Sequence, residues 1–110
     1  EEQNMKLVIR RTKSLAHEFY SRGITLEEIA EKLNVTSEYL SAQFHKEVGV
    51  SFSLYMKDYR VQQAKKLLLG TNLKLYEIAD QVGYNDPKHF SKVFREITGM
   101  LPAEYRKLNR

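Results

Sequence analysis

The hydrogen-bonding side chains of this sequence concentrate in residues 87–98, between regularly spaced apolar residues. The apolar positions are Phe90, Phe94 and Ile97, with Val93 beside them. This spacing is typical of an amphipathic helix that buries one face and exposes the other. The exposed face then carries Lys88, His89, Lys92, Arg95 and Glu96. Lysine and arginine are donors only, so this face suits a partner rich in acceptors or negative charge.

A second segment, residues 37–48, has the same pattern with different polar groups. Its inward-facing residues are Leu40, Phe44 and Val48. The side chains that this leaves exposed are Ser37, Glu38, Ser41, Ala42 and His45. This face offers a carboxylate acceptor, hydroxyls and a methyl group in place of two lysines, so the two segments differ in what they can bind.

Catalysis and metal binding find little support in the residues. His17, His45 and His89 fall on three different expected helices, and there is no cysteine. No close pair of carboxylates in an apolar setting offers acid–base chemistry, and scattered histidines make no ligand set. We therefore expect a protein that is not an enzyme and holds no metal or cofactor.

Composition and charge favour a polyanionic partner. The 110 residues carry a formal net charge of +4, with an isoelectric point of about 9.3. Residues 25–49 carry a net −3, whereas residues 1–24, 50–73 and 74–110 carry +2, +3 and +2. A basic balance favours nucleic acid as the partner. Residues 25–49 are the one segment with a net negative charge.

The chain shows no sign of export or membrane insertion. No apolar run approaches the ~18 residues that a membrane helix needs, and the polar start, Glu1 to Asn4, is unlike a signal peptide. The absence of cysteine fits a reducing cytoplasm. Because the sequence does not begin with Met, we expect a fragment of a longer protein.

We expect an all-α fold of about seven helices. Thr25 and Glu28 have the spacing of a capping box, and Ser37 is the expected cap of the following helix. In the first helix, Leu7, Val8, Arg11, Leu15 and Phe19 share one stripe. The predicted helices cover roughly residues 5–21, 26–33, 38–48, 51–69, 74–82, 87–98 and 102–107.

Part of the sequence occurs twice. Residues 26–30 match residues 75–79 at four of five positions with an offset of 49. One extra residue in the second copy then shifts the offset to 50, which pairs Phe44 with Phe94, Gly49 with Gly99 and Tyr55 with Tyr105. Tyr55 and Tyr105 are therefore expected to belong to the scaffold. Such repeats indicate a duplicated structural unit.

Each copy has the form of a helix-turn-helix. A small side chain, Ala30 or Ala79, stands where two helices cross closely over a short turn. We predict two helix-turn-helix subdomains, residues 5–49 and 74–108, joined by a long linker helix over 51–69. The alternative is a helical bundle whose repeat records only an old duplication.

Over about residues 5–108, the chain resembles the DNA-binding domain of the AraC/XylS family of bacterial transcription regulators. The resemblance lies in the run from Ile78 to Asp86, in the run from His89 to Arg95, and in Gly99, Pro102, Tyr105 and Arg106. Residues 59–68 resemble the linker helix of that family. The resemblance implies two lobes whose second helices, about 37–48 and 87–98, enter successive major-groove segments of promoter DNA. It also implies an N-terminal sensor or receiver domain, transcription activation and contact with RNA polymerase.

The amino-terminal part of each second helix supplies the candidate base contacts, because that part enters the groove. The candidates are Glu38, Ser41 and Ala42, and Lys88, His89 and Lys92. Lysine can donate to guanine, glutamate can accept from cytosine N4, and a methyl group can contact thymine.

Phosphate contacts are expected from Ser37, Lys57, Arg60, Lys65 and Arg95. Two of these have alternatives. Arg60 can instead pair with a carboxylate such as Asp80, and Lys65 can belong to a solvated face. The charge distribution leads us to expect that the second lobe supplies most of the affinity.

The two lobes should contact elements about one helical turn, ~34 Å, apart, with some bending of the DNA. The isolated chain is expected to be monomeric and to act in the cytoplasm at the nucleoid. Two other functions remain open: a protein-binding module, suggested by seven tyrosines and five phenylalanines, and a DNA binder without sequence preference.

Overall fold

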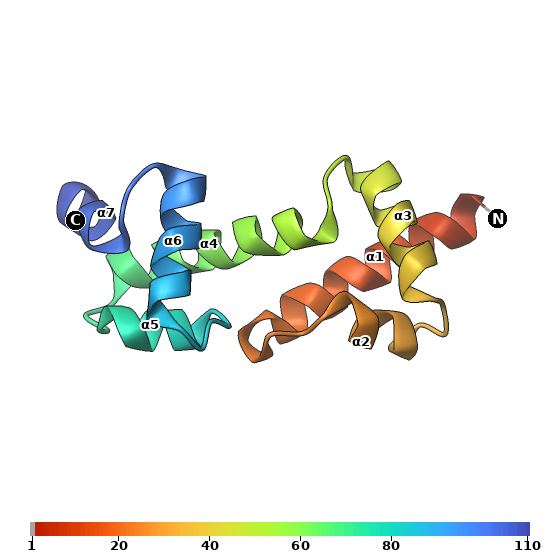
Figure 1. Ribbon diagram of the computed structural model, residues 1–110, viewed down its shortest axis with the longest axis horizontal. Helices are drawn as coiled ribbons and strands as arrows, with labels where there is room; N and C mark the ends of the chain where they lie inside the picture. The colour runs from red at the N-terminus through yellow and green to blue at the C-terminus, as the bar shows by residue number, and fades with distance from the viewer. Residues whose placement is uncertain (1) are drawn as a thin grey trace. The chain divides into compact units, whose positions relative to one another are not determined.

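Helices form nearly all the regular structure of residues 2–110, which is the part of the chain that the computed structural model describes (Figure 1). Glu1 lies outside the described residues. The elements in chain order are α1 (Glu2–Phe19), the 3₁₀ helix η1 (Tyr20–Arg22), α2 (Leu26–Lys32), α3 (Ser37–Val48), α4 (Phe52–Gly70), α5 (Leu75–Gln81), α6 (Pro87–Thr98) and α7 (Pro102–Asn109). The all-α prediction is confirmed. Within this range no helix is both long and apolar enough for a membrane crossing.

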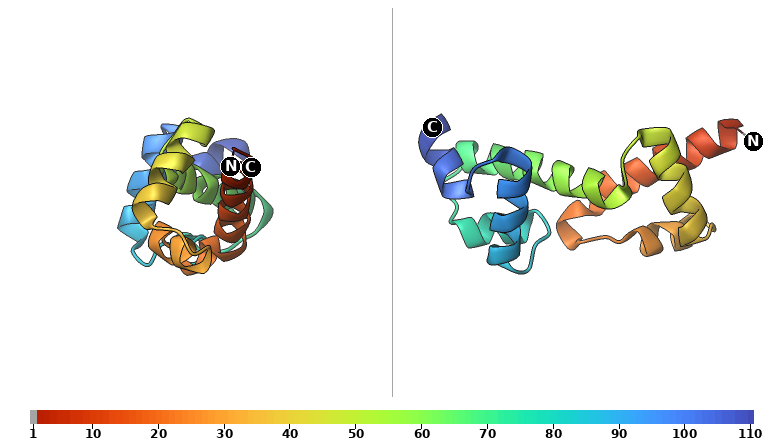
Figure 2. Two further views of the ribbon diagram at one scale, coloured as in Figure 1. Left: turned by 90° about the vertical axis from the view of Figure 1, so that its right-hand side faces the viewer. Right: turned by 45° about the horizontal axis from the view of Figure 1, so that its top comes forward.

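The chain forms two compact units. The first ends at Met56 and the second comprises Lys57–Arg110. In the first unit α1, α2 and α3 contact one another, and in the second unit α6 contacts both α5 and α7 (Figures 1 and 2). The boundary lies within α4, whose first turn packs into the first core through Phe52 and Met56.

The buried face of α1 differs from the predicted stripe. Ile9, Thr12 and Ala16 are buried, whereas Leu7 is 41% exposed and Arg11 is exposed. The prediction was wrong for Leu7 and Arg11. The Thr12 hydroxyl donates to the Val8 carbonyl at 2.8 Å, so this polar residue can lie in the core with its hydrogen bond satisfied.

The two helix-turn-helix copies match in detail. Ile29 and Ile78 are both fully buried, and so in effect are Ala30 and Ala79. Each turn has one residue with positive φ, Asn34 at 57° and Gly83 at 97°, and the offset of 49 residues pairs these two. Glycine and asparagine tolerate this conformation better than other residues, so the turn fixes how the second helix leaves the first.

The ring contacts of the two cores also correspond. Phe44 meets Tyr55 edge-to-face with centroids 5.2 Å apart, and Phe94 meets Tyr105 in the same geometry at 5.6 Å. Such arrangements are favourable for aromatic pairs. The expectation that Tyr55 and Tyr105 belong to the scaffold is confirmed.

Arg106 fastens the end of α4 to α7 within the second unit. Its Nε donates to the Leu68 carbonyl at 2.9 Å, and its Nη2 donates to the Thr71 carbonyl at 3.3 Å. The last carbonyls of a helix lack hydrogen-bond donors inside the helix, and here the guanidinium donates the missing hydrogen bonds. Arg106 is therefore a structural residue.

Candidate nucleic-acid interface

Local sequence fixes where α6 begins and which face it exposes. The Asp86 side chain accepts from the Lys88 backbone N–H at 3.0 Å, and Pro87 occupies the first turn. Phe90, Val93 and Phe94 are buried. These anchors turn the opposite face outward, and the exposed side chains there include Lys88, His89, Lys92 and Arg95.

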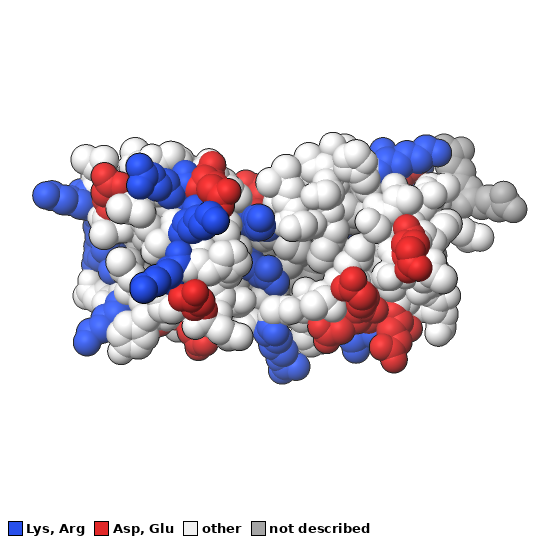
Figure 3. All heavy atoms as spheres, in the orientation of Figure 1, with Lys and Arg blue, Asp and Glu red and all other residues white. Residues whose placement is uncertain are grey.

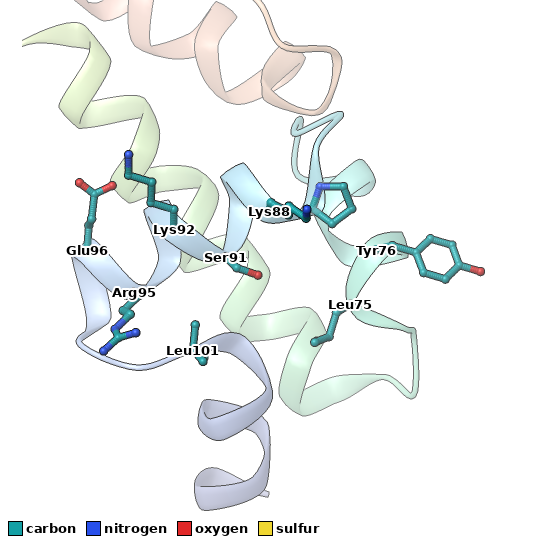
Figure 4. A pocket seen from close by; sticks show the side chains of 9 residues that line it. Leu75, Tyr76, Lys88, Ser91, Lys92, Arg95, Glu96 and Leu101 are labelled. Carbon is teal, nitrogen blue, oxygen red and sulfur yellow. The ribbon is translucent and has the colours of Figure 1, made fainter.

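Three of these cations line one groove on the second unit (Figure 4). Lys88, Lys92 and Arg95 line it together with Ser91, and Leu75 and Leu101 approach it from α5 and from the turn before α7. Ser91 was not among the predicted contacts. Ser91 is the repeat partner of Ser41, which was a predicted base contact. The alignment of the two copies therefore already indicated Ser91 as a candidate.

His89 lies against the ring of Tyr84. The two ring centroids are 5.3 Å apart at an interplanar angle of 83°. Tyr84 has a second neighbour, because the Arg60 guanidinium lies 5.6 Å from the centroid of its ring. Burial raises the pKa of the Tyr84 hydroxyl, and the positive charge of Arg60 acts in the opposite direction. Tyr84 is therefore a neutral, buried ring that touches two candidate DNA contacts.

The start of α3 differs from the prediction. The N-cap is Thr36, whose hydroxyl accepts from the Tyr39 N–H at 3.1 Å. Ser37 is the first residue of the helix, and its hydroxyl donates to Glu38 Oε1 at 2.7 Å. The prediction of Ser37 as the cap was wrong because two adjacent hydroxyl residues compete for this position, and the backbone conformation selects the first.

The exposed face of α3 is acidic at its amino-terminal end. Glu38, Ser41 and Ala42 are all exposed, while Leu40 and Phe44 are fully buried. The hydrogen bonds from the Ser37 hydroxyl and a backbone N–H lower the pKa of the Glu38 carboxyl. Glu38 therefore presents a charged acceptor where α6 presents Lys88.

The charged side chains of the two units are distributed differently. The second unit carries eleven Lys and Arg against six Asp and Glu, and the first carries seven against eight. On the face shown in Figure 3, acidic side chains gather over α2 and basic ones over α6. The attraction for a polyanion therefore falls mainly on the second unit.

The remaining predicted phosphate contacts lie on α4. Lys57, Arg60 and Lys65 are each half-buried. The Lys65 ammonium lies 5.7 Å from the Tyr105 ring centroid, so it packs on its own unit as well as facing solvent.

The described residues contain no cluster of His, Cys, Asp or Glu that could hold a metal ion. His17 instead makes a 2.7 Å hydrogen bond to the Tyr55 hydroxyl. Burial and the nearby charge of Lys13 lower the pKa of His17, so it acts as a neutral partner of Tyr55 near neutral pH.

Two tandem copies of a helix-turn-helix, each with an exposed polar face on its second helix, define a DNA-binding domain. A family model described as a helix-turn-helix domain matches residues 29–108. The chain belongs to the AraC-type helix-turn-helix family of DNA-binding transcription regulators.

Solved structures agree with this assignment. The C-terminal domain of AraT, a response regulator from Geobacillus stearothermophilus, is 37% identical with a TM-score of 0.91, over 93% of this chain and 85% of that one. The C-terminal domain of the two-component response regulator yesN from Fusobacterium nucleatum is 39% identical with a TM-score of 0.85, over 94% and 98%.

Among curated relatives, the lactose operon transcription activator of Staphylococcus xylosus is 37% identical over 79% of this chain and 31% of its own length. The chain spans between 12% and 37% of the length of the first curated relatives that it matches.

Proposed function

We propose that this chain binds promoter DNA sequence-specifically, with α3 and α6 each placed in the major groove. The observation that carries the proposal is the exposed row of Lys88, His89, Lys92 and Arg95 over the buried anchors of α6. The corresponding face of α3 is also exposed. A recognition helix needs this division into a buried and an accessible face.

The side chains of the two helices suit different bases. Lys88 and Lys92 donate to guanine O6 and N7, and His89 donates or accepts according to its tautomer. On α3 the ionised Glu38 accepts from cytosine N4, Ser41 offers a hydroxyl and Ala42 contacts a thymine methyl group. The recognised site is therefore asymmetric.

Phosphate contacts position the domain without selecting sequence. We assign them to Ser37, Lys57, Arg60, Lys65 and Arg95. Most of these carry positive charge, so the affinity should fall steeply as salt concentration rises.

The second unit should supply most of the affinity, because it holds the excess of positive charge. Lys92→Ala should weaken binding to the selected site more than Ser41→Ala, by a factor of several, in an equilibrium titration. A larger loss from Ser41→Ala would contradict this division between the lobes.

The proposal extends to the regulatory context. An N-terminal sensor or receiver domain would control this DNA-binding part, and contact with RNA polymerase would follow in transcription activation. AraT and yesN are described as response regulators and the Staphylococcus xylosus relative as a transcription activator. We further propose that the domain acts in the cytoplasm at the nucleoid, and that it is monomeric when isolated.

In vitro selection of bound sequences from a random DNA pool tests the central proposal. We expect an asymmetric consensus of two short elements about 10–10.5 base pairs apart. Enrichment of no consensus despite salt-dependent binding would point to a non-selective DNA binder. Absence of binding at low salt would contradict the proposal and favour a protein partner.

A further inference from the structure

Tyr76 is a large aromatic side chain on the surface of α5 that the core does not use. It is 59% exposed, more than any other aromatic side chain among the exposed large hydrophobics of the described residues. Its partner in the first repeat is Glu27, also exposed. The scaffold therefore does not require an aromatic residue at this position, which leaves Tyr76 available for a surface function.

Tyr76 borders the groove that contains the cations of α6. The groove has an apolar part, formed by Leu75, Pro87 and Leu101, and a polar part at Ser91. Its cations are Lys88, Lys92 and Arg95, and Glu96 is its one acidic residue. Figure 4 shows the Tyr76 ring projecting outward from α5, with its hydroxyl directed away from the helix.

A second hollow, which Tyr76 also lines, has the opposite charge. Its lining includes Glu77 and Asp80 and no lysine or arginine. Tyr76 thus lines both a basic groove with two net positive charges and an acidic hollow with two negative ones. A phosphate group is attracted to the basic side only.

We propose that the groove between α5, α6 and the turn before α7 holds one strand of the DNA backbone, with Tyr76 as a contact. The ring packs on a deoxyribose, and its hydroxyl donates to a phosphate oxygen. This inference rests on the proposed function and deepens it. In a helix-turn-helix the first helix crosses the backbone while the second lies in the major groove, which is the position that α5 has beside α6.

Both the apolar and the charged parts of the groove suit this occupant. Sugar carbons are apolar, and they lie between phosphates along each strand. An apolar wall beside Arg95, which is assigned to a phosphate, therefore matches a backbone segment, while Lys88 and Lys92 reach the base edges. Tyrosine is one of the side chains that donate to DNA phosphates. Because sugar and phosphate are the same at every base pair, Tyr76 should raise affinity without selecting sequence.

The test compares Tyr76→Phe and Tyr76→Ala with the unsubstituted chain by fluorescence anisotropy. Two duplexes are used: the one obtained by selection and one of random sequence, at the same salt concentration. Tyr76→Phe should weaken binding about three- to tenfold on both, which is the effect of one hydrogen bond. Tyr76→Ala should weaken it further on both, by a similar factor.

Leu108→Ala is the matched control, because Leu108 is 69% exposed in the same unit and does not line the groove. It should leave both affinities within twofold of the starting values. Circular dichroism and the melting temperature establish that each variant is folded. We expect all variants to fold, because Tyr76 and Leu108 are both exposed.

A single methylphosphonate, moved along the selected duplex, locates the contact. One substitution should weaken the unsubstituted chain and have little further effect on Tyr76→Phe. Unchanged affinity of Tyr76→Ala on both duplexes would overturn the inference and leave the groove to a protein partner. A loss confined to the selected duplex would overturn it in favour of a base contact. If selection yields no consensus, the random duplex alone still tests Tyr76, so the two proposals fail separately.

Discussion

At the scale of single residues, Tyr84 couples two candidate DNA contacts. It is only 6% exposed, with the Arg60 guanidinium over its ring and His89 at its edge. Cation–π and edge-to-face contacts restrict the side chains that make them. The backbone N–H of Val35 donates to Ala30 as that of Tyr84 donates to Ala79, so Val35 is the repeat partner of Tyr84 and the corresponding position of the first unit carries no ring.

Tyr84→Leu should therefore weaken DNA binding about three- to tenfold, because Arg60 and His89 lose the ring that orients them. Tyr84→Phe keeps the ring and should bind within twofold of the unsubstituted chain. Equilibrium titration at a temperature well below each melting transition measures this. Equal losses for the two variants would show that the hydroxyl, not the ring, is what matters.

Glu38 should remain ionised at lower pH than an ordinary glutamate, because Ser37 and a backbone N–H stabilise its carboxylate. A lowered pKa in the folded chain stabilises the fold above the pKa of the unfolded chain, and this contribution disappears as pH falls through the lowered value. Ser37→Ala should move the pKa of Glu38 upward. An NMR titration of the side-chain carboxyl measures the shift, and an unchanged midpoint would show that the Ser37 hydroxyl has no part in it.

At the scale of elements, the start of α3 depends on Thr36 and not on Ser37. Thr36→Ala should lower the free energy of unfolding by about 1 kcal/mol, which is typical for loss of an N-cap. Ser37→Ala should cost clearly less, since its hydroxyl bonds only to the exposed Glu38. Urea denaturation of the two variants provides the comparison. A greater loss from Ser37→Ala would contradict the assignment of the cap.

At the scale of the whole molecule, the two units are parts of one chain that α4 joins without interruption. If both contact one face of B-DNA, their elements must keep a helical phase of about 10–10.5 base pairs. Five base pairs inserted between the elements rotate one of them by about half a turn. Affinity for the selected site should then fall at least tenfold in a titration.

Five base pairs added outside the two elements form the control for this experiment. They change the length of the duplex but not the phase, so affinity should stay the same. Equal binding to both altered duplexes would mean that only one unit contacts DNA.

Much of the fold was predictable from sequence because its signals are local. The capping box at Thr25 and Glu28 acts within one turn, and both of its hydrogen bonds are present. Gly49 and Gly99 end α3 and α6 with positive φ, as residues without a side chain readily do. The repeat added information at long range, since each copy was evidence for the other.

Most exposed positions of α3 and α6 were also predictable, because helical periodicity separates buried anchors from accessible side chains. Ser37, which was expected to be exposed, is half-buried at the start of α3. The sequence by itself thus determined the helices, the duplication and the faces that carry Lys88, Lys92, Glu38 and Ser41.

Only the tertiary structure decided which surfaces neighbouring helices cover. Ile9 and Thr12 are buried instead of Leu7 and Arg11 because α1 packs against α2 and α3 through the face that also carries Ala16. The placement of Tyr84 against Arg60 and His89 joins residues from different elements, as does the groove beside Tyr76. Periodicity describes one helix at a time, so contacts between helices follow only from how they pack.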